Sequence, residues 1–205
     1  MRVAVLLAVV VAVPVAAGAF GLSPKLLLAT TQWPYIDLGL VGDFNLSFDR
    51  IAYEGRAEYW LEDNSIDHIS TRQTLLYRVA SRRPVSLQVG GGFWLSTEET
   101  SWGYIGPGPW EEGPDWVTEL RPFVEVRVPL SFDWCSIAPI FRYQVSAYRN
   151  YEEPGHKYHY VEPELIFDYV VTDRWAFEAR ARYWRGVGND WADVGFVELG
   201  PRISW

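Results

Sequence analysis

The chain has 205 residues, a length that suits one domain, and its formal net charge is −8. This charge excludes nucleic acid as a partner, because binding phosphates needs a basic surface. A single cysteine, Cys135, excludes an internal disulfide framework and a cysteine-based zinc site. Residues 21–205 contain no run of roughly 20 apolar residues of the kind that forms a transmembrane helix. We expect no cofactor.

The first nineteen residues have the pattern of a secretory signal. Met1-Arg2 gives a positive start, residues 3–13 are an unbroken apolar stretch, and Ala17-Gly18-Ala19 supplies the small residues of a cleavage site. We therefore predict a Sec-type signal peptide over 1–19 and a mature domain over 20–205. A retained membrane anchor is the alternative, and the shortness of the apolar run disfavours it.

Beyond the signal, apolar and polar residues alternate along the chain. The pattern is clearest in Ile137–Ala147 and Val197–Trp205. Strict alternation over ten or more residues predicts strands with two different faces, whereas a helix would repeat every three or four residues. Nine strands follow directly from it, over 35–48, 51–61, 70–80, 85–96, 116–130, 136–148, 158–171, 175–185 and 194–205.

These strands are long enough to cross a bilayer. At ~3.3 Å per residue and a tilt near ~40°, a strand of about eleven residues rises roughly 25–28 Å, close to the apolar band of a transmembrane barrel. The connections 49–50, 81–84, 131–135 and 172–174 are short, and they alternate with the longer links 62–69, 97–115, 149–157 and 186–193. Short turns at one end and long loops at the other are typical of bacterial barrels, with the turns in the periplasm.

The same sidedness predicts one more crossing near the start of the mature chain. If the last strand ends in the periplasm, strand 35–48 runs inward from the exterior, and Leu22–Thr31 must supply the preceding crossing. We therefore predict an all-β fold, a closed antiparallel up-and-down transmembrane barrel of ten strands. Single-chain bacterial barrels have even strand numbers, and eight is the alternative.

One face of the strands is apolar and the other is mixed. Alternation alone fits a lipid-facing barrel with a polar lumen or a soluble periplasmic barrel that binds an apolar ligand. Strand length, uneven connections and aromatic residues near the strand ends favour lipid. Four prolines, Pro122, Pro139, Pro163 and Pro201, fall on the apolar face inside predicted strands. Because proline cannot donate to a ladder, we expect bulges or strand ends there.

The signal, the alternating strands, the uneven connections and the final segment Val197–Trp205 together resemble small bacterial outer-membrane β-barrel proteins. In that class the assembly machinery recognises a C-terminal strand that ends in an aromatic residue, usually Phe. The resemblance thus implies that Trp205 is the barrel-assembly signal. It also implies a monomer in the cell outer membrane, in contact with lipid and lipopolysaccharide. The resemblance is architectural and indicates no subfamily.

The mixed face carries acids and arginines in near balance. A barrel of eight to ten strands is only just wide enough for side chains, so we expect these charges to satisfy one another in a mostly filled lumen. A narrow porin-like channel is the alternative. Aromatic residues predicted to fill the remaining interior are Trp60, Trp94, Phe123, Tyr148, Tyr160 and Trp184. The predicted lumen charge network is Asp43, Glu54, Arg56, Glu58, Arg78, Arg121, Glu125, Arg127, Arg142, Glu162, Glu164, Asp168, Glu178, Arg180, Arg182, Glu198 and Arg202.

The longest connection holds the candidates for contact with the cell's surroundings. They are Trp102, Tyr104, Trp110, Glu111 and Glu112. Exposed tryptophans beside carboxylates could stack on a sugar or hold calcium or magnesium against lipopolysaccharide. The simpler interpretation, which we favour, is that the aromatics form the upper interfacial girdle and the acids solvate the loop. We therefore expect a structural or surface-interaction role through the loops.

We expect no enzyme. The only histidines are His68, His156 and His159, and neither a Gly-x-Ser-x-Gly motif nor a metal-binding His-Glu helix is present. His159 is predicted to face lipid while Ser146 on the preceding strand faces inward, so the two cannot act together.

Overall fold

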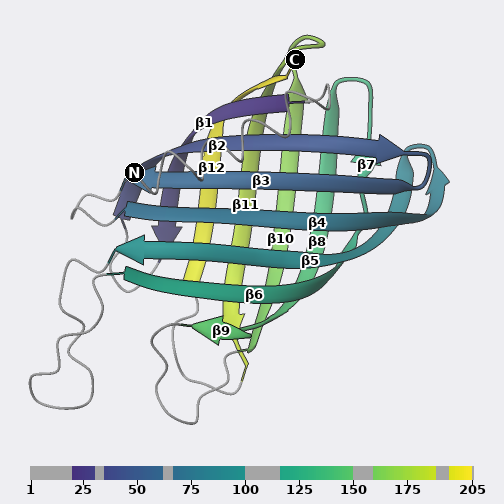
Figure 1. The fold of residues 1–205 in the computed structure, drawn as a ribbon. Helices are drawn as coiled ribbons and strands as arrows, with labels where there is room; N and C mark the ends of the chain where they lie inside the picture. Colours follow the sequence, from purple (N-terminus) through teal and green to yellow (C-terminus); the bar gives the residue numbers. More distant parts are fainter. Residues whose placement is uncertain are drawn as a thin grey trace, which may run out of the picture.

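The computed structural model describes residues 20–30, 35–61, 67–99, 116–149, 159–187 and 194–204, which form one closed antiparallel β-barrel (Figure 1). In the described part of the chain, no helix has the length and hydropathy needed to span a bilayer. The predicted signal peptide lies outside these residues, so residues 1–19 stay a prediction. The strands are β1 (Phe20–Thr30), β2 (Tyr35–Phe48), β3 (Ile51–Leu61), β4 (Asp67–Arg82), β5 (Val85–Glu99), β6 (Trp116–Arg127), β7 (Leu130–Ser131), β8 (Cys135–Val145), β9 (Tyr148–Arg149), β10 (His159–Val170), β11 (Trp175–Gly186) and β12 (Val194–Ser204).

Ten of these strands form the wall, and the prediction of a ten-stranded closed barrel is confirmed. Going around the barrel they follow the order β1, β2, β3, β4, β5, β6, β8, β10, β11, β12, and β12 pairs back with β1 through Gly21 and Ser204. The first strand, added on sidedness alone, is therefore a full member of the wall. The alternative of eight strands is wrong.

The two shortest strands continue longer ones past an interruption. Predicted strand 116–130 is interrupted after β6 at Pro129, which has no backbone N–H. Pairing resumes between Leu130 of β7 and Val85 of β5. Predicted strand 136–148 is also interrupted, between β8 and β9.

The break between β8 and β9 corrects one orientation. Phe123 of β6 pairs with Gln144, but Leu120 pairs with Tyr148, so three steps along β6 oppose four along its partner. One extra residue reverses the side to which every later side chain points. Tyr148, predicted to face the lumen, is consequently 53% exposed.

The prolines on the apolar face do not produce the expected bulges within their own strands. Pro139 pairs with Leu165, and Pro163 with Phe141, in an unshifted register. Because both polar groups of one residue in an antiparallel strand point to the same neighbour, each proline removes a single ladder bond. Pro24 and Pro201 lie opposite one another at the β1–β12 seam, where pairing pauses and then resumes in the same register. The expectation of bulges or strand ends at the prolines is therefore wrong, except that the extra residue after β8 lies beside Pro122.

The outer surface of the barrel is apolar at mid-strand. The exposed fraction is 57% for Leu75 and 61% for Val124, while a charged side chain on the inner face of the same strand as Val124, Glu125, is buried. A protein in water does not expose a belt of this kind, which matches the hydrocarbon core of a bilayer. The interpretation as a soluble barrel with an apolar lumen is therefore wrong.

Aromatic side chains gather at the short-turn end of this belt. Phe48, Trp134 and Trp175 are exposed there, and Trp134 packs edge-on against Tyr169 with ring centroids 6.3 Å apart. A rim of aromatic side chains of this kind holds a barrel at the level of the lipid headgroups.

The turn after β2 carries a charged residue at the same end of the barrel. A hydrogen bond with the Tyr77 hydroxyl raises the pKa of Arg50 in this turn above its ordinary value.

Two glycines make room for aromatic rings across a strand pair. Gly39 pairs with Trp60 on the inner face, and a Cβ on Gly39 would overlap the indole. Gly55 pairs with Phe44, whose ring covers it in the same way on the opposite face. An aromatic ring laid over a strand glycine shields the exposed backbone and pins the register.

Leu165 lies in the middle of β10 and faces outward with 46% exposure. We predict that Leu165→Arg lowers the free energy of unfolding in lipid vesicles by roughly 2–4 kcal/mol, because a cation near the bilayer midplane loses its hydration. The matched control is Val171→Arg, beyond the end of β10, for which we expect roughly 0–1 kcal/mol. Denaturant titration in vesicles checks both, and equal costs for the two variants would contradict a membrane-facing belt.

Candidate functional site: the charged lumen

The lumen is built from short motifs in which acid and arginine alternate on one face of a strand. Residues two apart point to the same side, so Glu54-x-Arg56-x-Glu58 on β3 and Glu178-x-Arg180-x-Arg182 on β11 each present three charges inward. Strand pairing then sets opposite charges side by side. Glu125 of β6 faces Arg142 of β8, and Arg142 faces Glu162 of β10.

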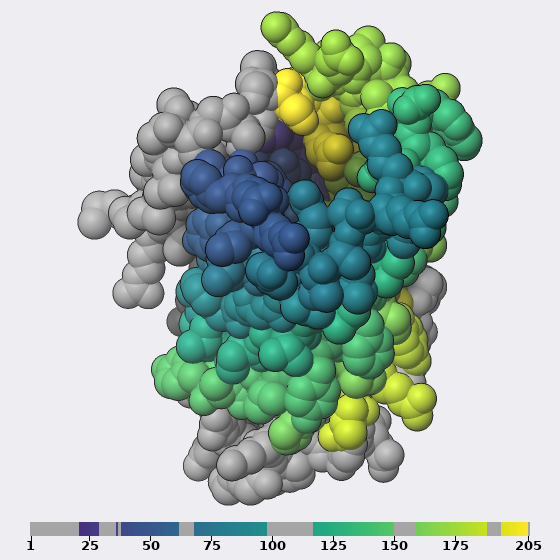
Figure 2. Space-filling view, turned by 90° about the vertical axis from the view of Figure 1, so that its right-hand side faces the viewer, coloured from purple at the N-terminus to yellow at the C-terminus, as the bar shows by residue number. Residues whose placement is uncertain are grey.

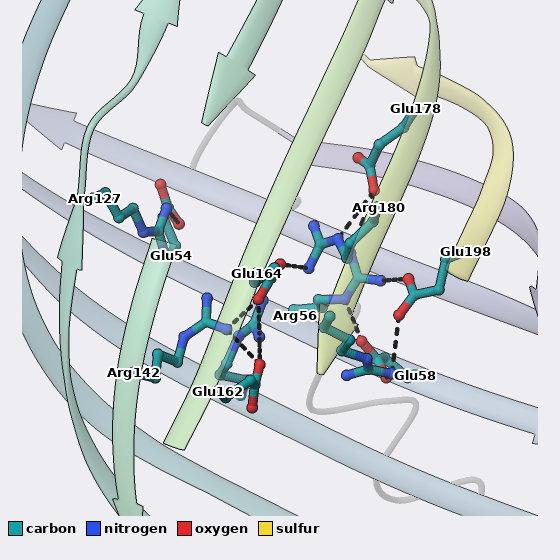
Figure 3. A network of polar contacts seen from close by, with 12 residues as sticks. Glu54, Arg56, Glu58, Arg127, Arg142, Glu162, Glu164, Glu178, Arg180 and Glu198 are labelled. Carbon is teal, nitrogen blue, oxygen red and sulfur yellow. Dashed lines mark hydrogen bonds and ion pairs between the residues drawn. The ribbon is translucent and has the colours of Figure 1, made fainter. Parts of the chain in front are cut away.

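Arg142 is the centre of one half of the network. It is fully buried, and its guanidinium contacts Glu125 at 2.5 Å, Glu162 at 2.7 Å and Glu164 as well. Glu125 also binds Arg127 at 2.5 Å. Three carboxylates from β6 and β10 therefore surround one arginine of the strand between them. Figure 3 shows the two from β10, Glu162 and Glu164, beside Arg142.

A second half of the network gathers around Glu198 of β12, which is fully buried. Its two carboxylate oxygens bind Arg56 at 2.5 Å and Arg182 at 2.9 Å. Both arginines also contact Glu58. Charge-assisted pairs that share partners in this way compensate much of the cost of removing each ion from water.

Glu178 and Glu164 connect the two halves. Glu178 forms ion pairs with Lys25 at 2.7 Å, with Arg180 at 3.4 Å and with Arg56 of the second half at 3.8 Å. Arg180 in turn reaches Glu164 at 2.8 Å. Glu164 belongs to the Arg142 cluster, so the chain of contacts is continuous (Figure 3).

Several of these contacts join strands that are not neighbours in the wall. Arg56 of β3 reaches Glu198 of β12, and Arg127 of β6 reaches Glu54 of β3 at 2.6 Å. Arg72 of β4 approaches Glu164 of β10 at 3.4 Å. Side chains that reach one another from non-adjacent strands fill the space between those strands, so ion pairs cross the lumen.

An aromatic layer lies on the long-loop side of the ion pairs. The guanidinium carbon of Arg121 is 4.4 Å from the ring centroid of Trp94, 4.2 Å from that of Tyr160 and 5.1 Å from that of Trp184. The Arg121 guanidinium also forms an ion pair with the Glu119 carboxylate, at 2.5 Å. Cation–π contacts of this number hold the arginine in place and close the interior with flat, apolar rings.

The short-turn end is open by contrast. Figure 2 looks onto this end, where the surface is hollowed between the β2–β3 turn in blue, the β4–β5 turn in teal and β12 in yellow. A cavity of about 250 Å³ lies here, which we call the vestibule. The charged residues that line it are Asp43, Glu54, Arg56, Arg72, Arg127, Asp168, Glu178, Arg180 and Arg202.

The structure places most of the predicted charged residues in this interior. Asp43, Glu54 and Arg202 lie toward the vestibule, while Arg78 is exposed near the β4–β5 turn, apart from the buried ion pairs. The loop candidates Trp102, Tyr104, Trp110, Glu111 and Glu112, together with the side chain of Trp205, lie outside the described residues.

Sequence reasoning missed four charged members of the lumen, Lys25, Arg72, Glu119 and Arg149. Alternation was sufficient to find Arg72, which shares a face with Arg78, and Glu119, which shares one with Arg121. It was not sufficient for Arg149, the partner of Glu119, because the extra residue after β8 turns this side chain inward.

The described residues hold no group of three or more potential metal ligands. His68 stacks on Trp94 with centroids 6.1 Å apart, and His159 Nδ1 lies 2.7 Å from the Tyr143 hydroxyl. Ser146 contacts Glu119 in the lumen, so it points away from His159.

Arg142 gives a direct test of the network. We predict that Arg142→Met lowers the free energy of unfolding by about 3–5 kcal/mol, because Glu125, Glu162 and Glu164 lose their shared partner while buried. The control Arg78→Met should fold like the parent. Denaturant titration of both variants in micelles checks this, and an unchanged midpoint for Arg142→Met would show that the network does not stabilise the barrel.

No family model matches this chain, and no curated protein matches it significantly. The translocator domain of autotransporter NalP from Neisseria meningitidis is similar in structure, with a TM-score of 0.53 and 10% identity over 100% of this chain and 96% of that one. The beta domain of the Bordetella autotransporter BrkA has a TM-score of 0.51 and 8% identity, over 92% and 100% of the two chains. Neisserial surface protein A has a TM-score of 0.44 and 10% identity, over 91% and 96%. The chain has the fold of bacterial outer-membrane β-barrels.

Proposed function

We propose that this protein is a closed, non-conducting barrel of the outer membrane that holds its long connections at the cell surface. The observation that carries the proposal is the set of ion pairs between separate walls, such as Arg56 with Glu198 and Arg127 with Glu54. A barrel that passes solutes needs a continuous aqueous path, and these contacts occupy it. The protein's role then belongs to its loops, which meet lipopolysaccharide and the environment.

The aromatic layer supports the same proposal. Arg121 and the rings of Trp94, Tyr160 and Trp184 add a second barrier on the long-loop side of the ion pairs. The two autotransporter domains share the fold, but the crossed lumen of this chain supports a sealed barrel rather than a translocating one. We further propose that it is a monomer that contacts outer-membrane lipid directly.

A narrow channel is the second candidate, and the vestibule is the observation that favours it. An open cavity of about 250 Å³ would serve as one mouth of such a channel. Ionic current distinguishes the two candidates because only the channel conducts.

We predict that the purified protein produces no current steps in a planar lipid bilayer, because ion pairs and aromatic rings block the lumen in series. A porin reconstituted in the same lipid is the positive control, and heat-modifiable migration on a detergent gel shows that the protein is folded. Stable steps of reproducible size would overturn the closed barrel in favour of the channel.

The location and assembly route need a separate test. We expect the full chain, expressed in a Gram-negative host, to accumulate in the outer-membrane fraction in a heat-modifiable form. Deleting Trp205 should reduce that amount several-fold if the barrel-assembly machinery recognises this residue, while the matched variant Trp205→Phe should retain it. Equal assembly of the deletion and the parent would contradict the role of Trp205, and accumulation in the soluble fraction would contradict the location.

A further inference from the structure

The vestibule carries side chains that the closed lumen does not explain. Five guanidinium groups and four carboxylates line it, so its lining has one more positive charge than negative. Because the cavity is hollowed toward the short-turn end, a small solute on that side can reach these groups (Figure 2).

Two of the five guanidinium groups are weakly paired. Arg72 approaches Glu164 at 3.4 Å and Glu162 at 4.0 Å, and Arg202 approaches Asp168 at 3.3 Å and Glu178 at 3.4 Å. The other three vestibule arginines each have a carboxylate within 2.8 Å: Arg56 with Glu198, Arg127 with Glu125 and Arg180 with Glu164.

The weak pairing leaves donors to spare. An arginine offers five N–H donors in a fixed plane that matches a carboxylate or phosphate. The buried Nε of Arg202 has no hydrogen-bond acceptor among the described residues. Arg72 shares its nearest acceptor, Glu164, with Arg142 and Arg180.

The carboxylates of the vestibule are mostly engaged elsewhere. Glu178 forms ion pairs with Lys25 and Arg180. Glu54 accepts hydrogen bonds from Arg127 and Asn45. Asp168 accepts from Ser136 as well as Arg202. Asp43, which lies at the wall beside Gly21, and the Oδ1 atom of Asp168, which accepts no hydrogen bond from the described residues, remain to repel an anion.

We propose that the vestibule binds a small oxyanion, held by Arg72 from one wall and Arg202 from another. Phosphate and carboxylate share the geometry that these guanidinium groups recognise. An ion in this cavity would supply the acceptor that the Arg202 Nε lacks, and it would give Arg72 a partner that is not shared with Arg142 and Arg180. The site shares Arg56, Arg127 and Arg180 with the ion pairs that cross the lumen. An ion can reach it from the short-turn side, so binding needs no passage through the barrel.

Isothermal titration calorimetry on the folded protein in an uncharged detergent tests the proposal. Sodium phosphate and sodium acetate are titrated in separate arms, with sodium chloride at equal ionic strength as the reference. Arg72→Gln and Arg202→Gln should each weaken binding about tenfold or more, because a charge-assisted hydrogen bond is lost. Arg78→Gln, on the inner face of the same strand as Arg72 but outside the vestibule, is the matched control and should bind like the parent.

The outcomes separate clearly. Heat from phosphate alone supports a phosphate site, and heat from both anions supports a general oxyanion site. No heat beyond chloride in either arm overturns the proposal, as does an Arg78→Gln variant that weakens binding as much as Arg72→Gln. If Arg72→Gln fails to fold, the titration of Arg202→Gln tests the proposal. The Arg202 side chain is 31% exposed, so its replacement disturbs the buried ion pairs least.

Discussion

A guanidinium group inside a barrel needs an anion at hydrogen-bond distance, because an uncompensated buried charge costs several kcal/mol. Arg142 satisfies this requirement with three carboxylates, and Glu198 satisfies two arginines at once. The strands that carry these residues must be held in one register for all the contacts to form. The charged lumen thus constrains strand order, shear and closure together.

The same requirement explains why the barrel is inside out relative to a protein in water. Charged side chains pair in the interior, and the leucines and valines at mid-strand, such as Leu75 and Val124, are left for lipid. Ladder bonds between all ten wall strands satisfy the backbone, which has no water to bind in a bilayer. Prolines are accommodated on the outer face at the loss of single bonds.

The two ends of the lumen differ. At the long-loop end, rings of Trp94 and Trp184 enclose Arg121, and flat aromatic surfaces seal the interior. At the short-turn end the lumen opens into the vestibule, which is bordered by the loosely paired Arg202 and, deeper in the barrel, by Arg72, the cross-strand partner of Trp94. This asymmetry agrees with the proposed function, in which the loops act at the cell surface, and with the proposed binding of a small anion at the opposite mouth.

The sequence by itself determined the strands, their bounds within a few residues and the face of nearly every side chain, because alternation is a local property of extended backbone. It also required the first strand, through the sidedness of the turns. Only the tertiary structure decided which charges meet across the lumen, as Arg56 with Glu198, since such contacts depend on barrel diameter and strand shear. It alone decided that one extra residue after β8 turns Tyr148 outward, and that the lumen ends in a vestibule. These features arise from how distant strands close on one another, which no stretch of the chain encodes locally.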